Sequence, residues 1–180
     1  MTFLGLYIIL LLILLFIFFA WISSAIFGAP FQPSSNKALG IMVRLAEINK
    51  YPKGKKIKVA DLGSGNGKIV IKYAKLNPKV EAHGFEINPF LAWISRARVK
   101  NLGLQGRVFI HRKNFFRQNF KDFDIINSFQ INYVMSQMEE KLMKEMKRGA
   151  KIISNTWQFP NWKPEKKESY GLGNVYLYVK

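Results

Sequence analysis

The stretch "ADLGSGNGKIV", residues 60–70, places three glycines within five positions, the first of them two residues after an acidic side chain. The overlapping run "IKVADL" (57–62) is mostly apolar and indicates a strand, and "KIVIKYAKL" (68–76) indicates a helix. Glycine permits backbone torsions and a close backbone approach that a Cβ atom would block. The stretch therefore predicts a strand–turn–helix unit whose turn presents backbone N–H groups to a ligand.

Strand and helix signals alternate along the rest of the chain. Further strands are expected at 80–87, 107–114, 123–130, 150–158 and 174–180, and further helices at 36–50, 89–103 and 137–149. Such alternation implies parallel strands covered by helices on both faces. The predicted fold class is therefore α/β, with a mostly parallel, Rossmann-like sheet. Residues 159–173, which contain two prolines and two glycines, give no clear signal.

The amino-terminal segment is apolar. Residues 1–36 carry no charged side chain, and residues 3–22 can form a helix. A helix of about 20 residues covers about 30 Å, which is the thickness of a bilayer core. A cleavable signal peptide would have a basic residue before a shorter apolar run, and no basic residue precedes this one. We therefore expect a transmembrane helix at 1–24, a linker at 25–36 and one folded domain at 37–180.

Charge is confined to the chain from Lys37 onward, where 28 Lys and Arg face 11 Asp and Glu and give a net charge of +17. The positive-inside rule then places the amino terminus outside and the domain in the cytoplasm. A basic domain suits an anionic lipid leaflet, an acidic partner or nucleic acid, and its charge alone does not choose among them. The chain has no Cys, and His83 and His111 lack metal-ligand spacing, so we expect no metal site.

Three kinds of nucleotide-binding turn compete for the glycine pattern. A Walker loop needs Ser or Thr after its Lys, but Ile69 follows Lys68. A dinucleotide turn has the spacing G-x-G-x-x-G, which this chain lacks. The adenosylmethionine-binding turn of class I methyltransferases has the pattern D/E-x-G-x-G-x-G, which is matched at every position by Asp61, Gly63, Gly65 and Gly67. The plainer alternative is that the glycines only make a tight strand-to-helix turn.

Two further positions favour the adenosylmethionine interpretation. Glu86 ends the second expected strand, where a carboxylate can accept hydrogen bonds from both ribose hydroxyls. Asn114 follows the third strand and can accept a bond from the adenine amino group, while Phe115 covers the ring. Asp61 is expected to hold the turn by accepting backbone N–H bonds. The predicted cofactor is S-adenosyl-L-methionine, and its predicted contacts are Asp61, Gly63, Ser64, Gly65, Gly67, Glu86, Asn114 and Phe115.

Four stretches together resemble one enzyme family. They are "PFQPSSNKALGIMVRLAEI" (30–48), "DLGSGNGKIVI" (61–71), "GFEINPFLAWISR" (84–96) and "FPNWKP" (159–164). They are similar to the small membrane-anchored protein-lysine methyltransferases, whose eukaryotic members modify the mitochondrial ATP synthase c subunit and the adenine nucleotide translocase. The resemblance implies methyl transfer from S-adenosylmethionine to a lysine of a membrane protein. The family commonly has Asp where this chain has Asn66, and an acidic residue where it has Asn114.

Lysine methylation makes modest demands on a site. An apolar, aromatic-lined slot lowers the pKa of the amine by desolvation and aligns it for attack, so no general base is assigned. The slot is expected after the fourth and fifth strands, with the stretch around Trp162 favoured because polar neighbours argue against a core position. The candidates are Phe129, Gln130, Asn132, Tyr133, Trp157, Phe159, Pro160 and Trp162.

Other functions stay open at this point. Methyltransferases that act on glutamine amides or adenine amines typically carry Asn/Asp-Pro-Pro-Tyr/Phe after the fourth strand, and "NSFQINYV" (127–134) contains no proline. The basic charge leaves RNA as an alternative substrate, and the apolar amino terminus leaves a lipid-like small molecule. A membrane adaptor that keeps the fold without catalysis is an alternative of a different class.

Overall fold

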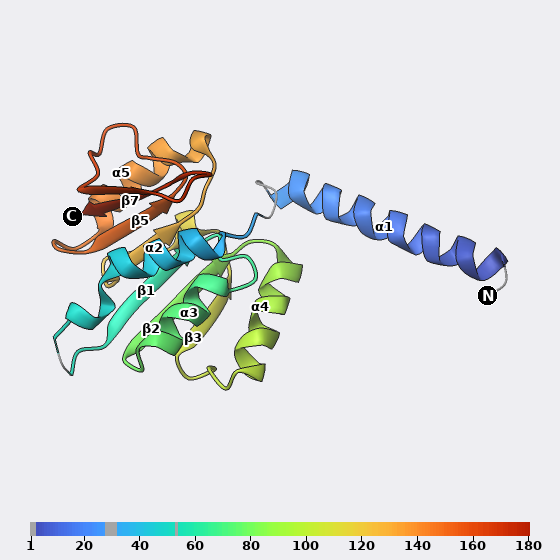
Figure 1. Ribbon diagram of the computed structural model, residues 1–180, viewed down its shortest axis with the longest axis horizontal. Coiled ribbons are helices and arrows are strands. Elements are labelled where there is room, and N and C mark those ends of the chain that lie inside the picture. The colour runs from blue at the N-terminus through green and yellow to red at the C-terminus, as the bar shows by residue number, and fades with distance from the viewer. Residues whose placement is uncertain (1–2, 28–31, 53) are drawn as a thin grey trace. The chain divides into compact units, whose positions relative to one another are not determined.

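The computed structural model describes residues 3–27, 32–52 and 54–180, and the chain divides into two units, Met1–Gln32 and Pro33–Lys180. Within the first unit, α1 (Phe3–Phe27) is a single helix without a charged residue (Figure 1). No helix among the described residues combines the length and apolarity of a membrane span. The predicted transmembrane helix is therefore not confirmed.

The second unit holds the remaining helices and strands (Figure 1). Its helical elements are α2 (Asn36–Ala46), η1 (Ile48–Lys50), α3 (Lys68–Leu76), α4 (Pro89–Asn101), η2 (Phe115–Arg117), η3 (Asn132–Val134) and α5 (Met135–Glu145). Its strands are β1 (Ile57–Leu62), β2 (Val80–Glu86), β3 (Val108–Arg112), β4 (Ile125–Ser128), β5 (Lys151–Asn155), β6 (Lys166–Ser169) and β7 (Asn174–Val179).

All seven strands form one sheet in the order β3-β2-β1-β4-β5-β7-β6. The pairs among β1 to β5 are parallel, as the alternation of strands and helices predicts. The two remaining strands are antiparallel, because a parallel neighbour needs a long crossover and the chain runs from β5 into β6 and β7 without a helix. The predicted Rossmann-like α/β fold is thus confirmed, with an antiparallel carboxyl-terminal edge.

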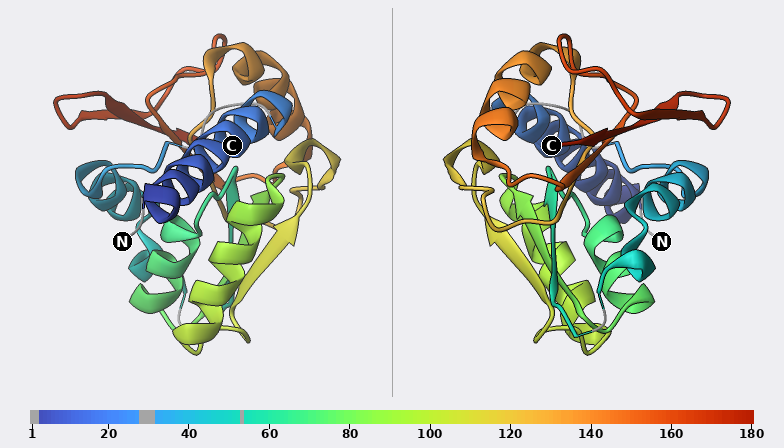
Figure 2. Two further views of the ribbon diagram at one scale, coloured as in Figure 1. Left: turned by 90° about the vertical axis from the view of Figure 1, so that its right-hand side faces the viewer. Right: turned by 90° about the vertical axis from the view of Figure 1, so that its left-hand side faces the viewer.

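Helices cover both faces of the sheet (Figures 1 and 2). One apolar layer joins α2, α3 and α4 to one face, and a second joins α5 to the other. Successive strand residues alternate between the layers: Ile125 and Ile153 belong to the first, and Ile126 and Ile152 to the second. This alternation explains why the central strands read as continuous apolar runs.

Local signals set the starts of α2 and α4 where the sequence predicts them. The Ser35 hydroxyl accepts the N–H of Ala38 at 3.1 Å and caps α2. Pro89 occupies the first turn of α4, which Asn88 caps. The bounds of β1 and α3 agree with the predicted 57–62 and 68–76. The predicted helix at 36–50 is divided, because Glu47 adopts a left-handed backbone, with φ of 50°, between α2 and η1.

The strand β6 was not predicted. Its four residues, "KKES", are mostly exposed and polar, so no apolar alternation marks them. They are held by backbone pairing with β7 and by an ion pair between Arg44 of α2 and Glu168. An edge strand of this kind depends on its neighbour rather than on its own sequence.

Candidate functional site

The carboxyl ends of the five parallel strands meet at one edge of the sheet, which we call the carboxyl edge. The strand order reverses between β1 and β4, and ligands of such sheets bind beyond the carboxyl edge at this reversal. The glycine turn follows β1, Phe129 and Gln130 follow β4, and Trp157 follows β5. The fold therefore brings the predicted cofactor turn and the predicted substrate segments to the same edge.

The glycines of the turn are required by its geometry. Gly63, Gly65 and Gly67 have φ angles of 73°, 53° and 75°, which side-chain-bearing residues rarely adopt. A Cβ atom on Gly63 would collide with the side-chain amide nitrogen of Gln130, and one on Gly67 with the hydroxyl of Ser95. The glycines therefore make a tight strand-to-helix turn, as the plainer alternative predicts.

Glu86 links the glycine turn to the start of α4. One carboxylate oxygen accepts the N–H of Gly65 at 2.7 Å, and the other accepts the N–H of Asn88 at 2.8 Å. The role that the sequence suggested for Asp61, accepting backbone bonds in the turn, thus falls to Glu86. Each carboxylate oxygen can accept a further bond, so contact with ribose hydroxyls stays a prediction.

Asp61 is a buried carboxyl at the end of β1, only 2% exposed. Burial, and then the negative charge of Glu86, raise the pKa of Asp61 to about 8. A nearby positive charge favours the ionised form of such a group. Asp61 is therefore suited to face a cationic part of a ligand.

Asn114 and Phe115 lie after β3, as predicted. The Asn114 amide oxygen accepts the N–H of Phe116 at 2.9 Å and so caps η2. This oxygen retains a second lone pair for an adenine amino group. Phe115 is half-buried beside Phe116, with ring centroids 4.5 Å apart. Their contact with adenine stays a prediction.

Ser64 differs from the other predicted cofactor residues. Its hydroxyl is buried and lies so close to Gly84 of β2 that a Cβ there would come within 2.6 Å of it. The side chain thus points toward the sheet, and Ser64 can serve a ligand through its backbone alone. Within the described residues, the buried hydroxyls of Ser64 and Ser95 have no hydrogen-bond partner.

The residues of the turn fit S-adenosylmethionine. Gly63, Gly65 and Gly67 carry no side chains, so the backbone of the turn can approach a ligand closely. Asp61 offers a buried carboxyl to the positive charge that this cofactor carries on its sulfur. Glu86 lies one strand away, at the end of β2.

The predicted substrate residues divide into two groups. Tyr133 is 73% exposed, Trp157, Asn132 and Pro160 are exposed, and Phe129 and Gln130 are half-buried. Gln130 also donates to the carbonyl of Leu62 at 2.7 Å, which fixes it against the glycine turn.

Phe159 and Trp162 form the second group, because Phe159 packs into the core and half-buried Trp162 packs against it. Phe159 is 2% exposed, and its ring centroid lies 4.8 Å from that of Tyr178 and 5.9 Å from that of Trp162. Polar neighbours did not keep Trp162 away from the core, since the chain after β5 folds back over the face that α5 covers. The place of Trp162 in a lysine slot stays a prediction.

Thr156 is a site feature that the sequence did not reveal. It has φ of 74°, an unusual conformation for a β-branched residue, and the N–H of Trp157 donates to the carbonyl of Asn155 at 2.9 Å. Such a three-residue turn is strained. It sets the direction in which Trp157 leaves β5, and no residue pattern marks it in advance.

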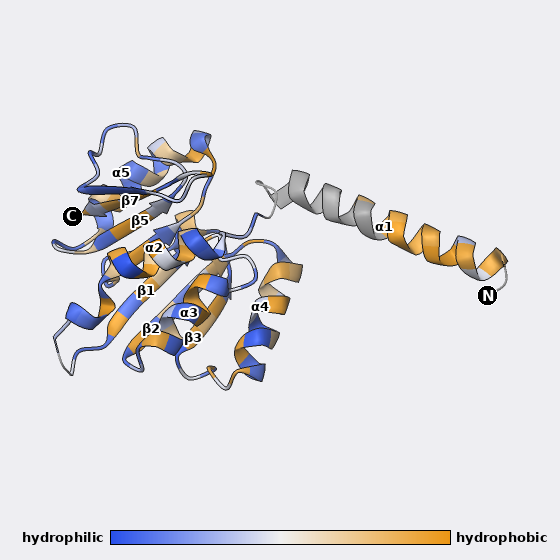
Figure 3. Cartoon of the chain, viewed as in Figure 1, coloured by the Kyte–Doolittle hydropathy of each residue, from blue (hydrophilic) through white to orange (hydrophobic). Residues whose placement is uncertain are grey.

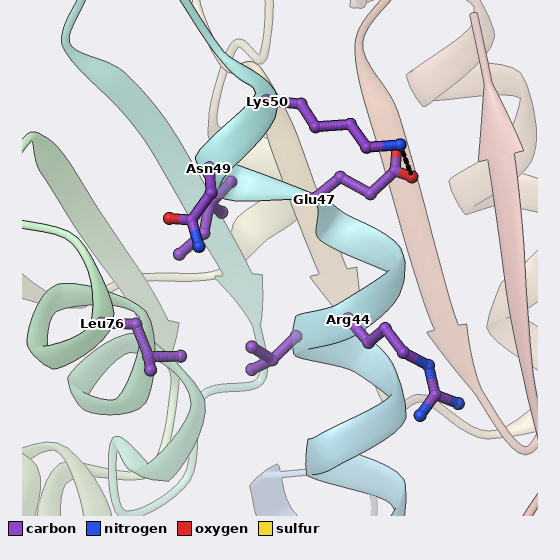
Figure 4. A pocket seen from close by; sticks show the side chains of 7 residues that line it. Arg44, Glu47, Asn49, Lys50 and Leu76 are labelled. Atoms are coloured by element: carbon purple, nitrogen blue, oxygen red, sulfur yellow. Dashed lines mark hydrogen bonds and ion pairs between the residues drawn. The ribbon is translucent and has the colours of Figure 1, made fainter. Parts of the chain in front are cut away.

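A hollow of about 270 Å³ lies away from the carboxyl edge (Figure 4). Its lining comes from the ends of α2 and α3 and from η1: Val43, Arg44, Glu47, Ile48, Asn49, Lys50 and Leu76. Lys151, the first residue of β5, donates to Glu47 at 2.7 Å, which places the hollow near the amino ends of the strands. Lys151 and Lys50 lower the pKa of Glu47 to about 2, so these groups form a structural ion cluster.

Comparison with known proteins identifies the family to which the chain is similar. Residues 61–166 match the ANTKMT methyltransferase domain. The chain is 32% identical over 149 residues to the lysine N-methyltransferase of the ATP synthase c subunit from Mus musculus, covering 83% of this chain and 57% of that protein. It is 30% identical over 154 residues to a protein-lysine N-methyltransferase of Saccharolobus islandicus, covering 83% and 92%. The chain spans about three fifths of the length of the mammalian relatives.

A solved structure supports the fold. The RNA methyltransferase of Salinibacter ruber in complex with S-adenosyl-L-homocysteine superposes with a TM-score of 0.75 at 21% identity, covering 82% of this chain and 93% of that one. At this identity the likeness concerns the class I methyltransferase fold alone. The family match covers more than half of the sequence and begins at Asp61, so the chain belongs to the ANTKMT methyltransferase domain family.

Proposed function

We propose that this protein is an S-adenosylmethionine-dependent protein-lysine N-methyltransferase. The observation that carries the proposal is the glycine turn tied to Glu86 at the strand reversal, in a chain of this family. Relatives named as lysine methyltransferases of the ATP synthase c subunit and of the adenine nucleotide translocase support a protein substrate.

The cofactor would be held by residues of three neighbouring strand ends. When bound, S-adenosylmethionine supplies a methyl group on a positively charged sulfur. The glycine backbone provides close contact, Asp61 balances positive charge, and Glu86 binds the ribose hydroxyls. Asn114 and Phe115 recognise the adenine.

The substrate lysine would enter between the segments after β4 and β5. Exposed Tyr133 and Trp157, with half-buried Phe129 and Gln130, provide an aromatic and partly dry surface there. Removing an ammonium group from water favours its neutral form, which is the form that attacks a methyl group. The surface also aligns the amine, so the site needs no dedicated base.

We further propose that the amino-terminal segment is a membrane anchor and that the domain lies in the cytoplasm. Residues 1–36 carry no charge, whereas Lys37, Arg44 and Lys50 follow closely, in agreement with the positive-inside rule. Large apolar side chains are exposed on all sides of the first half of α1, from Phe3 to Leu15. Protease treatment of intact cells should leave a tag at the carboxyl terminus protected, and cleavage from outside would contradict this orientation.

The enzymatic proposal is tested with the full chain, isotope-labelled S-adenosylmethionine and a membrane fraction. We expect label on a protein band, at lysine, and clearly less label with a Glu86→Ala variant at limiting S-adenosylmethionine. Label in RNA or in an organic extract would instead support a nucleic acid or a lipid-like substrate. Absence of S-adenosylmethionine binding by calorimetry would reject methyl transfer altogether and favour a non-catalytic adaptor.

A further inference from the structure

The outer side of α4 carries two aromatic rings followed by two cations. Phe90 is 54% exposed and Trp93 is 64% exposed, and their ring centroids are 6.2 Å apart with an interplanar angle of 24°. Arg96 and Lys100 are also exposed. Spacings of three and four residues place these side chains on one face of the helix. Two adjacent exposed aromatic rings on the outside of a helix are a candidate binding surface.

This aromatic pair lies at the carboxyl edge. The helix begins directly after β2, and its cap residue Asn88 donates to the same Glu86 carboxylate that holds Gly65. Ile87, which is exposed, extends the apolar surface toward the strand end. Figure 3 shows the start of α4 as hydrophobic, in contrast to the hydrophilic residues near its other end. The pair therefore borders the proposed cofactor site.

The segment that contains the pair is basic. Residues 87–121 contain no Asp or Glu, and their exposed cations are Arg96, Lys100, Arg112, Arg117 and Lys121. A surface of this charge complements anionic lipid headgroups. Aromatic rings beside cations are typical of segments that lie in the headgroup region of a bilayer.

The entry of the chain into the domain lies at the same edge. Lys68, the first residue of α3, donates to the carbonyl of Ser34 at 2.7 Å, and the side chain of Asn155, the last residue of β5, donates to the Ser34 hydroxyl at 3.3 Å. Only residues 28–33 separate Phe27, the end of α1, from Ser34. The chain therefore enters the domain beside the strand ends that form the proposed site.

We propose that Phe90 and Trp93 dock on an anionic lipid bilayer, with their rings in the headgroup region and Arg96 and Lys100 beside lipid phosphates. This inference rests on the membrane location in the proposed function. The contact would hold the carboxyl edge, and with it the lysine-binding surface, against the bilayer. A substrate lysine close to the membrane surface would then meet the site without leaving the interface.

The test is fluorescence quenching of the full chain in phosphatidylcholine–phosphatidylserine vesicles with brominated acyl chains. A Trp21→Phe background removes the tryptophan of α1. We expect Trp93→Phe in this background to remove about half or more of the remaining lipid quenching, because ring depth decides contact with the bromines. Trp162→Phe is the matched control, since Trp162 packs against the core, and it should leave the quenching unchanged. Equal quenching with and without Trp93 would overturn the proposal.

Two further measurements separate this inference from the proposed function. Calorimetry with S-adenosylmethionine reports the cofactor site, and Phe90→Ser/Trp93→Ser should bind it as the parent chain does. Loss of lipid quenching by Trp93→Phe in a chain that binds no S-adenosylmethionine would reject the proposed enzyme and keep the docking surface. The double variant should label intact membranes less than the parent chain and detergent-solubilised membrane proteins equally. Equal loss in both, without lipid quenching, would overturn lipid docking and assign the rings to a protein substrate.

Discussion

The carboxylate of Glu86 holds Gly65 by a hydrogen bond of 2.7 Å across 21 residues of sequence. The turn after β1 and the helix after β2 are thereby fixed to each other, since the same carboxylate also accepts a bond from Asn88. A side chain expected to bind only the cofactor therefore also shapes the site that receives it.

This double role predicts a combined defect in Glu86→Ala. Two backbone N–H groups lose their acceptor, one of them buried, so we expect a free energy of unfolding lower by about 1–3 kcal/mol. S-adenosylmethionine affinity should fall about tenfold or more, which corresponds to about 1.4 kcal/mol. Urea unfolding and calorimetry measure the two effects. Glu86→Gln retains one acceptor oxygen and should be intermediate, and parent-like affinity in the alanine variant would refute the assignment.

A second prediction concerns Gly67. Gly67→Ala forces a Cβ into a left-handed position and against the Ser95 hydroxyl, whereas Gly103→Ala meets the same torsional cost, with φ of 64°, in open space. The torsional cost is about 1–2 kcal/mol in each, and Gly67→Ala should lose more. Urea unfolding compares them.

Adding Ser95→Ala is the control for this prediction. The added change removes the clashing hydroxyl and should restore part of the stability that Gly67→Ala loses. Equal losses for Gly67→Ala and Gly103→Ala would show that the turn tolerates the extra atom.

The third prediction concerns pH and Asp61. Its folded-state pKa, about 8, lies above the ordinary value of 3.8, so the folded protein binds more protons than the unfolded chain between these values. The contribution of Asp61 to stability must then fall as pH rises from about 4 to 8. Asp61→Asn should remove this slope, and its stability relative to the parent chain should rise by more than about 1.4 kcal/mol between pH 5 and pH 8.

Urea unfolding of both proteins at the two pH values measures the difference, and other titrating groups cancel in the comparison. A constant difference between the proteins would mean that Asp61 is ionised in the fold. Because the site is proposed to hold a cation against this carboxylate, Asp61→Asn should also weaken S-adenosylmethionine binding.

The fourth prediction separates the substrate surface from the core. Trp157→Ala should lower methyl transfer at least about tenfold through lost alignment of the amine, with little change in stability or cofactor affinity. Phe159→Ala is the contrasting variant, because it opens a cavity among buried rings and should cost about 3–5 kcal/mol. Label incorporation, calorimetry and thermal unfolding distinguish the two. Normal label incorporation by Trp157→Ala would exclude it from the lysine surface.

The sequence predicts the parts of this fold that depend on local pattern. The apolar run of residues 57–62 predicts β1, the glycines after it predict the turn, and the apolar periodicity of residues 68–76 predicts α3. None of these predictions needs distant residues. The placement of Glu86 at a strand end is also local, so its presence at the site could be predicted. Its bond to Gly65 could not, since it requires β2 to lie beside β1.

Features that depend on tertiary contacts were not predictable in the same way. The polar strand β6 exists through pairing with β7, and Trp162 is half-buried because it packs against Phe159 and Tyr178. The strained torsion of Thr156 is set by bonds such as that from its N–H to the carbonyl of Asn174, 2.7 Å long. The residues next to Trp162 and Thr156 in the sequence do not indicate these distant partners.

The fixation of Ser34 has a mechanical consequence. Lys68, the first residue of α3, and Asn155, the last residue of β5, both donate hydrogen bonds to it. These two elements lie on either side of the proposed site. A tension applied through the preceding chain would reach these two residues before any other part of the domain. A pulling force on the preceding chain would therefore act first on the elements beside the proposed site rather than on the core.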